Sequence, residues 1–178
     1  MDKFKGIPKL ARITSWSPYL LPFSIGIAYG CSFYSNLNPI DLLIALIAIS
    51  SSLSFGFGLN FYTDQDVDRL HDGKLKDIDL GKQPILSGLV SEKEAVSFCK
   101  LTFVMSFLGF FVNIIFGILI ALNTVVLGIV YSLPPFRFKA KPVGDVAINV
   151  ISGSILLFLA GIIFKEYISW IPLYFSHP

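Results

Sequence analysis

The sequence predicts an all-α fold, a polytopic helical bundle inside a membrane. Of its 178 residues, 54% are hydrophobic and only 15% are charged, and the mean hydropathy is +0.71. Soluble domains carry roughly 25% charged residues, so the chain is too apolar for that class. About 20 apolar residues cross a bilayer as a helix. Four charge-free stretches approach or exceed this length, namely residues 13–40, 42–63, 101–136 and 146–164.

Capping and turn residues divide these stretches into five predicted helices. Pro39 follows the turn between the first two, and Ser91-Glu92-Lys93-Glu94 is a capping box that starts the third. Leu133-Pro134-Pro135 ends the fourth helix, because proline cannot continue it. The predicted helices are residues 14–36, 40–64, 92–112, 115–133 and 144–164, and a sixth apolar segment begins near Tyr167.

The basic residues predict the orientation of the bundle. If five helices alternate, every Lys and Arg except Lys165 falls on one side, which is the pattern of cytoplasmic loops. We therefore expect an integral protein of the cell membrane with a cytoplasmic N-terminus, and a single membrane domain over residues 1–178. This topology accounts for the basic residues, so the net charge of +2 does not indicate a nucleic-acid partner.

The most informative segment lies at the cytoplasmic end of the second predicted helix. Asn60, Asp64 and Asp68 follow an otherwise apolar run. Residues spaced four apart share one face of a helix, so these three side chains point together while Asp66 faces elsewhere. Hard oxygen ligands suit Mg²⁺, which one or two carboxylates hold together with the phosphate oxygens of a substrate. The segment therefore predicts a Mg²⁺ site.

Two cytoplasmic loops bring cations to the same side of the membrane. The connection 64–93 is about thirty residues long, and long connections are commonly functional. The second loop, residues 131–141, is short and basic. Acidic groups beside Lys and Arg suit a diphosphate that is bridged by Mg²⁺ and clamped by cations. The apolar bundle would hold a hydrocarbon tail, so an isoprenyl diphosphate satisfies both demands.

Three segments in this order resemble the UbiA-type intramembrane prenyltransferases: residues 60–68, 81–91 and 131–139. The resemblance covers nearly the whole chain. It implies a helical bundle, normally of nine spans, with a central cavity and one aspartate-rich motif in each half. The chain stops at Pro178, before a second such motif, so we expect an incomplete bundle with about five to six of the nine spans.

The resemblance also implies an enzyme that transfers a prenyl group from an isoprenyl diphosphate donor to a lipophilic acceptor in the lipid bilayer, with Mg²⁺ as cofactor. It assigns both metal binding and catalysis to Asn60, Asp64 and Asp68. Gln83 departs from the pattern, because the family often has Arg before this proline, and the departure lowers the number of cations. The resemblance assigns binding of the diphosphate to Lys82, Arg137, Lys139 and Tyr131.

Several alternatives accompany this interpretation. The aspartates could form an ordinary polar helix end, and the cations of the two loops could serve topology alone. The protein could be a non-catalytic truncated remnant, or a membrane subunit that binds polyprenyl diphosphate or pairs with a second protein half. A transporter is disfavoured because the polar groups lie at the interface rather than the midplane. A calcium loop is excluded because Arg69 stands where an EF-hand needs Gly.

Overall fold

The computed structural model of the chain describes residues 6–31, 38–72 and 83–164. Every regular element in these ranges is helical, which confirms the all-α fold. The sixth apolar segment near Tyr167 lies outside the described residues. The principal helices are α2 (Ser17–Cys31), α3 (Pro39–Thr63), α5 (Glu92–Ser106), α6 (Ile114–Thr124), α7 (Pro142–Val150) and α8 (Leu157–Ile163).

Short irregular helices lengthen some of these elements. The 3-10 helix η4 (Phe107–Phe111) follows α5, and the π-helix η5 (Val125–Val130) follows α6. A second π-helix, η7 (Ile151–Leu156), joins α7 to α8. Three of the resulting helices in the described part of the chain are long and apolar enough to cross a membrane, and the helix over 114–130 is apolar but shorter. The three long ones are Pro39–Thr63, Glu92–Phe111 and Pro142–Ile163.

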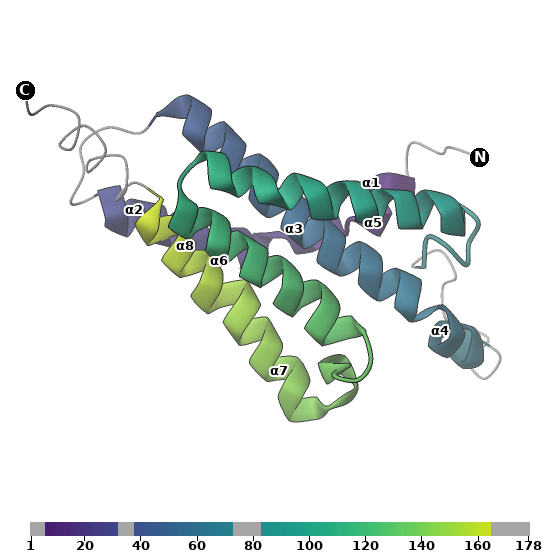
Figure 1. The fold of residues 1–178 in the computed structure, drawn as a ribbon. Helices are drawn as coiled ribbons and strands as arrows, with labels where there is room; N and C mark the ends of the chain where they lie inside the picture. Colours follow the sequence, from purple (N-terminus) through teal and green to yellow (C-terminus); the bar gives the residue numbers. More distant parts are fainter. Residues whose placement is uncertain (1–5, 32–37, 73–82, 165–178) are drawn as a thin grey trace, which may run out of the picture.

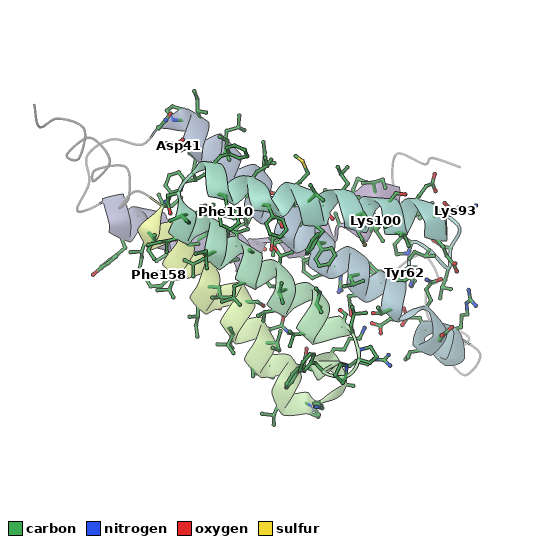
Figure 2. All side chains as sticks on the ribbon, viewed as in Figure 1. Asp41, Tyr62, Lys93, Lys100, Phe110 and Phe158 are labelled. Atoms are coloured by element: carbon green, nitrogen blue, oxygen red, sulfur yellow. The ribbon has the colours of Figure 1, made fainter. Side chains whose placement is uncertain are left out.

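The smaller elements gather at one end of the bundle. Figure 1 shows α1 (Gly6–Leu10), α4 (Gln65–Asp72) and the first turns of α5 and α7 at this end. The predicted capping box is confirmed. The Ser91 hydroxyl oxygen accepts the backbone N–H of Glu94, and the Glu94 carboxylate accepts the backbone N–H of Ser91. In Figure 2, Lys93 and Tyr62 lie toward this end, while Asp41 and Phe158 lie toward the opposite one.

The helices approach closely where small residues meet. A Cβ at Gly26 in α2 would clash with the carbonyl oxygen of Phe158, and one at Gly161 in α8 would clash with that of Phe23. Helices in membranes pack mainly through such close van der Waals contact. The main core lies where α2, α3, α6 and α8 meet. It is centred on the fully or almost fully buried Phe23, Ile49, Phe116 and Leu157.

Large apolar side chains also cover the outside of the bundle. Leu101, Val104 and Phe111, on α5 and η4, are 62%, 65% and 76% exposed. Water-soluble proteins rarely expose contiguous apolar surface of this kind. A hydrocarbon surrounding accounts for it, because lipid tails are as apolar as these side chains.

Candidate functional site

The helix that carries the aspartate motif is broken inside it. α3 ends at Thr63, Asp64 forms a turn, and α4 begins at Gln65. The Asp64 N–H still donates to the Asn60 carbonyl oxygen at 3.0 Å, and the Asp68 N–H donates to that of Asp64 at 2.8 Å. The sequence suggested one uninterrupted helical face. The structure divides that face but keeps its four-residue spacing.

Two glutamines hold the end of α3. Gln83 Nε2 donates to the carbonyl oxygen of Phe61 at 2.9 Å, and Gln65 Nε2 donates to that of Tyr62 at 3.1 Å. Carbonyl groups in the last turn of a helix need partners from outside the helix, and these side chains supply them. Gln83 Oε1 also accepts the N–H of Ile85 at 2.8 Å. This buried side chain therefore joins the loop 83–90 to the end of α3.

The Lys139 ammonium lies in a cradle of three oxygens from the end of α3. Its Nζ donates to Asn60 Oδ1 at 3.0 Å and to Thr63 Oγ1 at 2.8 Å. It lies 2.6 Å from Asp64 Oδ1, and the Lys139 side chain is only 9% exposed. The loop 133–141 and the end of α3 are 76 to 79 residues apart in sequence, and this contact brings them together.

The turn geometry of the loop directs a second cation at Asp64. Arg137 has the left-handed backbone conformation, with φ 37° and ψ 54°, and precedes the 3-10 turn η6 (Phe138–Ala140). Strained conformations of this kind gather at functional sites. Arg137 Nη2 lies 3.7 Å from Asp64 Oδ1, with 40% of its side chain exposed. Both cations of the loop therefore face the same carboxylate.

The electrostatics of Lys139 reflect two opposing effects. Burial lowers the pKa of its ammonium group, because desolvation disfavours the charged form. The Asp64 carboxylate opposes this by raising that pKa. The charge of Arg137 lowers it, and the smaller effect of Asp68 raises it. The acidic pair and the lysine thus share one electrostatic environment at the end of α3.

The donor set of the cradle fits a hard cation. Its amide, hydroxyl and carboxylate oxygens already converge on a positive charge, that of Lys139. Within the described ranges, no three His, Cys, Asp or Glu side chains gather into a metal site. A metal here would therefore rely on Asn60, on the carboxylates of Asp64 and Asp68, and on oxygens from a ligand. Mg²⁺ commonly binds through one or two carboxylates and substrate phosphates.

Tyr131 lies in a different polar group from the cradle. Its hydroxyl donates to Asp145 Oδ1 at 2.8 Å. Asn149 Nδ2 donates to the same oxygen at 3.0 Å, and the Tyr19 hydroxyl donates to Asn149 Oδ1 at 2.9 Å. This Tyr19–Asn149–Asp145–Tyr131 network links α2, α7 and the residue after η5. Lys82, the remaining residue assigned to the diphosphate, lies outside the described part of the chain.

An aromatic wall connects the N-terminal region to α3. The rings of Tyr19 and Phe57 meet edge to face with centroids 5.5 Å apart. The Arg12 guanidinium lies 5.6 Å from the ring centroid of Phe57 and 5.4 Å from that of Phe61. Phe57 and Phe61 are one turn apart on α3, so the wall runs along that helix, and Asn60 lies between the two residues in sequence.

Sequence reasoning missed three residues of the Lys139 cradle and of the Tyr19–Asn149–Asp145–Tyr131 network. Thr63 escaped notice because a threonine at a helix end is unremarkable by itself, although it lies three residues from Asn60. Asn149 carried a usable signal, since a carboxamide four residues after Asp145 in an apolar helix faces the same side. Tyr19 carried none, because its partner is 130 residues away.

The sequence model of the UbiA prenyltransferase family matches residues 19–177. The chain belongs to the UbiA prenyltransferase family. It is therefore an integral membrane protein with the fold of that family, as its resemblance indicated. A comparison with curated protein sequences gave no match.

Solved structures of UbiA homologues are similar to this chain. A UbiA homologue from Archaeoglobus fulgidus bound to DMAPP and Mg²⁺ is 33% identical, with a TM-score of 0.78 over 90% of this chain and 54% of that one. The same homologue bound to GPP and Mg²⁺ is 31% identical, with the same TM-score and coverage. A digeranylgeranylglyceryl phosphate synthase, at 23% identity and a TM-score of 0.70 over 89% of this chain and 52% of that one, shares the fold. The chain thus spans about half the length of these relatives.

Proposed function

We propose that this chain provides the diphosphate and metal site of a membrane prenyltransferase. The reaction is transfer of a prenyl group from an isoprenyl diphosphate to a lipophilic acceptor. Asn60, Asp64 and Asp68 are the proposed metal ligands and catalytic residues. The proposed diphosphate ligands are Arg137, Lys139, Lys82 and Tyr131. Residues 1–178 act as one membrane unit in this proposal.

The observation that carries the proposal is the meeting of opposite charges at the end of α3. Asp64 has both Arg137 and Lys139 within 4 Å, at 3.7 and 2.6 Å. A diphosphate needs cations, and a metal needs hard oxygens. Both sets of groups meet in one place, on a family fold whose homologues are solved with Mg²⁺ and the prenyl diphosphates DMAPP and GPP.

The residues divide the chemistry between them. Mg²⁺ bound by the motif would neutralise charge that builds on the departing diphosphate. Arg137 and Lys139 neutralise the same charge from the loop, as preorganised donors do in other phosphate sites. The aromatic rings of Phe57 and Phe61 are the kind of surface that stabilises a cation, and the Arg12 guanidinium already lies over both of them. The apolar helices exclude water from the allylic carbon.

The orientation in the membrane belongs to the same proposal. Figure 1 has α1, α4 and the starts of α5 and α7 at one end, and the basic residues of the described chain concentrate there. Positive charge marks cytoplasmic loops. We assign this end, with α1 and the aspartate motif, to the cytoplasm.

The test is Mg²⁺-dependent binding of a radiolabelled isoprenyl diphosphate to the purified protein in detergent. Loss of a hydrogen-bond partner of a metal ligand typically costs about 10–100-fold in affinity. Asp64→Ala removes a proposed metal ligand itself, so binding should weaken at least about 100-fold. Asp66→Ala is the matched control, since Asp66 is an exposed aspartate two residues away. Equal binding by Asp64→Ala and the unchanged protein would refute the proposed site. Binding without prenyl transfer would favour the non-catalytic alternative.

A further inference from the structure

All three N–H donors of the Lys139 ammonium are used in the cradle. A lysine ammonium has three donors and no acceptor. The acceptors are Asn60 Oδ1, Thr63 Oγ1 and Asp64 Oδ1, at 3.0, 2.8 and 2.6 Å. In this arrangement Lys139 has no donor left for a phosphate oxygen.

Two of the three cradle oxygens belong to proposed metal ligands, Asn60 and Asp64. An ammonium group and a metal ion cannot both lie within bonding distance of the same few oxygens, because like charges so close together repel strongly. The observed position of Lys139 and a metal bound to Asn60 and Asp64 therefore exclude each other. The same residue cannot hold a diphosphate and remain in the cradle.

The cradle favours a cation even without a metal. The last turn of a helix carries partial negative charge on its carbonyl groups, and a nearby cation is stabilised by it. Asn60 and Thr63 are in the last turn of α3, and Asp64 adds a full negative charge. In the observed arrangement, Lys139 neutralises this end of α3.

We propose that Lys139 is the resident counter-ion of the Asn60–Thr63–Asp64 cradle, and that Mg²⁺ and a diphosphate displace it together. This inference rests on the proposed function and adds a coupling to it. Mg²⁺ alone must expel Lys139 without offering the ammonium a new partner. A diphosphate offers that partner, so each ligand favours the binding of the other, and couplings of this kind commonly amount to about 5–150-fold. Lys139 thereby keeps the metal from binding tightly until the diphosphate arrives.

The first test measures binding of Mg²⁺ alone by calorimetry at one fixed pH. Lys139→Met keeps an unbranched side chain only one atom shorter and removes its charge, so we expect Mg²⁺ to bind at least about tenfold more tightly than to the unchanged protein, because like-charge repulsion is lost. Lys141→Met is the matched control, since Lys141 is an exposed lysine of the same loop that lies 4.8 Å from the Phe138 ring. It should leave the affinity unchanged. Equal or weaker Mg²⁺ binding by Lys139→Met would overturn the proposal.

The second test uses the unchanged protein and does not depend on the folding of a variant. An amine-selective acylating reagent is applied with and without saturating Mg²⁺ and DMAPP, and modification of each lysine is measured by mass spectrometry. Release from the cradle should change the labelling of Lys139 at least severalfold, while Lys141 serves as the internal control. Identical labelling of Lys139 in both conditions, under ligand concentrations shown to saturate the site, would also overturn the proposal.

The outcomes separate the two proposals. Failure of Mg²⁺-dependent isoprenyl diphosphate binding would refute the proposed function, whatever happens to Mg²⁺ alone. Normal isoprenyl diphosphate binding with no gain in Mg²⁺ affinity in Lys139→Met would leave that function intact and remove only the counter-ion role.

Discussion

Two polar clusters on the same helix behave differently. Near the polar end of α3, Asn60 and Asp64 meet the charged Lys139, and the Asp64 side chain remains 24% exposed. Within the span, Ser52 meets Asn123 and Thr124, and all three are fully buried and neutral. Asn123 Nδ2 donates to Ser52 Oγ at 3.0 Å, and the hydroxyl oxygens of Ser52 and Thr124 lie 2.9 Å apart.

The two clusters differ in whether a ligand can replace one of their side chains. The end of α3 is held by a charged side chain on a loop, and a charged ligand can replace that side chain. The inner cluster joins α3 to α6 in a place where no water or ion can substitute for a lost hydrogen bond. We therefore expect changes at the end of α3 to alter ligand binding, and changes at the inner cluster to alter stability.

The strongest effect among the supporting residues is expected at Gln83. Gln83→Met has a similar length but removes the donor to the Phe61 carbonyl and the acceptor for the Ile85 N–H. The end of α3 then loses its connection to the loop 83–90, and Asn60 and Asp64 lose their fixed position. Outer-shell partners of metal ligands are typically worth 10–100-fold in affinity, and we expect a loss of about tenfold in Mg²⁺-dependent isoprenyl diphosphate binding.

The control for this prediction is Ser87→Ala. Ser87 Oγ donates to the Pro84 carbonyl oxygen at 3.3 Å, so this hydrogen bond stays within the same loop. Its loss should leave binding unchanged. A tenfold loss in both variants would mean that any disturbance of this loop weakens the site, and that the contact of Gln83 with α3 has no special role.

The part of this molecule that sequence predicts best is the part that depends on local pattern. Apolar length predicted the three described helices that are long enough to cross a membrane, and the four-residue spacing predicted that Asn60 and Asp64 share one side. The end of α3 agrees with the predicted helix over 40–64, but the separate helix α4 was not predicted. The contact of Gln83 with Phe61, 22 residues apart, also has no signal in the local pattern. Gln83 was instead read as a lost cation, and it is a hydrogen-bonding residue that holds the end of α3.

The other features that the sequence did not predict depend on contacts between distant segments of the chain. The resemblance assigned Lys139 to the diphosphate, but no spacing in the sequence shows that its ammonium lies among the oxygens of α3. The same holds for the Tyr19–Asn149–Asp145–Tyr131 network, whose ends come from α2 and from the residue after η5. Such pairings depend on how helices pack, and a single sequence does not contain that information in readable form.

A smaller effect on binding is expected from Tyr131→Phe, which tests whether this network belongs with the ligand site. The substitution keeps the ring and removes the hydroxyl that donates to Asp145. If Tyr131 turns its single O–H from Asp145 to the diphosphate when the ligand binds, as proposed, its loss should weaken binding about fivefold, the equivalent of roughly 1 kcal/mol. Tyr19→Phe is the matched control, because it removes a hydroxyl from the other end of the same network. Equal affinities for both variants would assign Tyr131 to the scaffold.

Ser52→Ala should have no effect on ligand binding and should lower stability instead. It removes the acceptor of Asn123 Nδ2, and the carboxamide oxygen of Asn123 already lacks a hydrogen-bond partner among the described residues. Hydrogen bonds between membrane helices average about 0.6 kcal/mol and reach about 1.7, so we expect unfolding in mixed detergent to become easier by about 1 kcal/mol. Ser51→Ala, at a half-buried neighbour, controls for the loss of a serine from α3. Should Ser52→Ala weaken isoprenyl diphosphate binding while Ser51→Ala does not, the two clusters would be energetically coupled along α3. The cluster around Asp64 could then no longer be assigned to ligand binding alone, nor the cluster around Ser52 to stability alone.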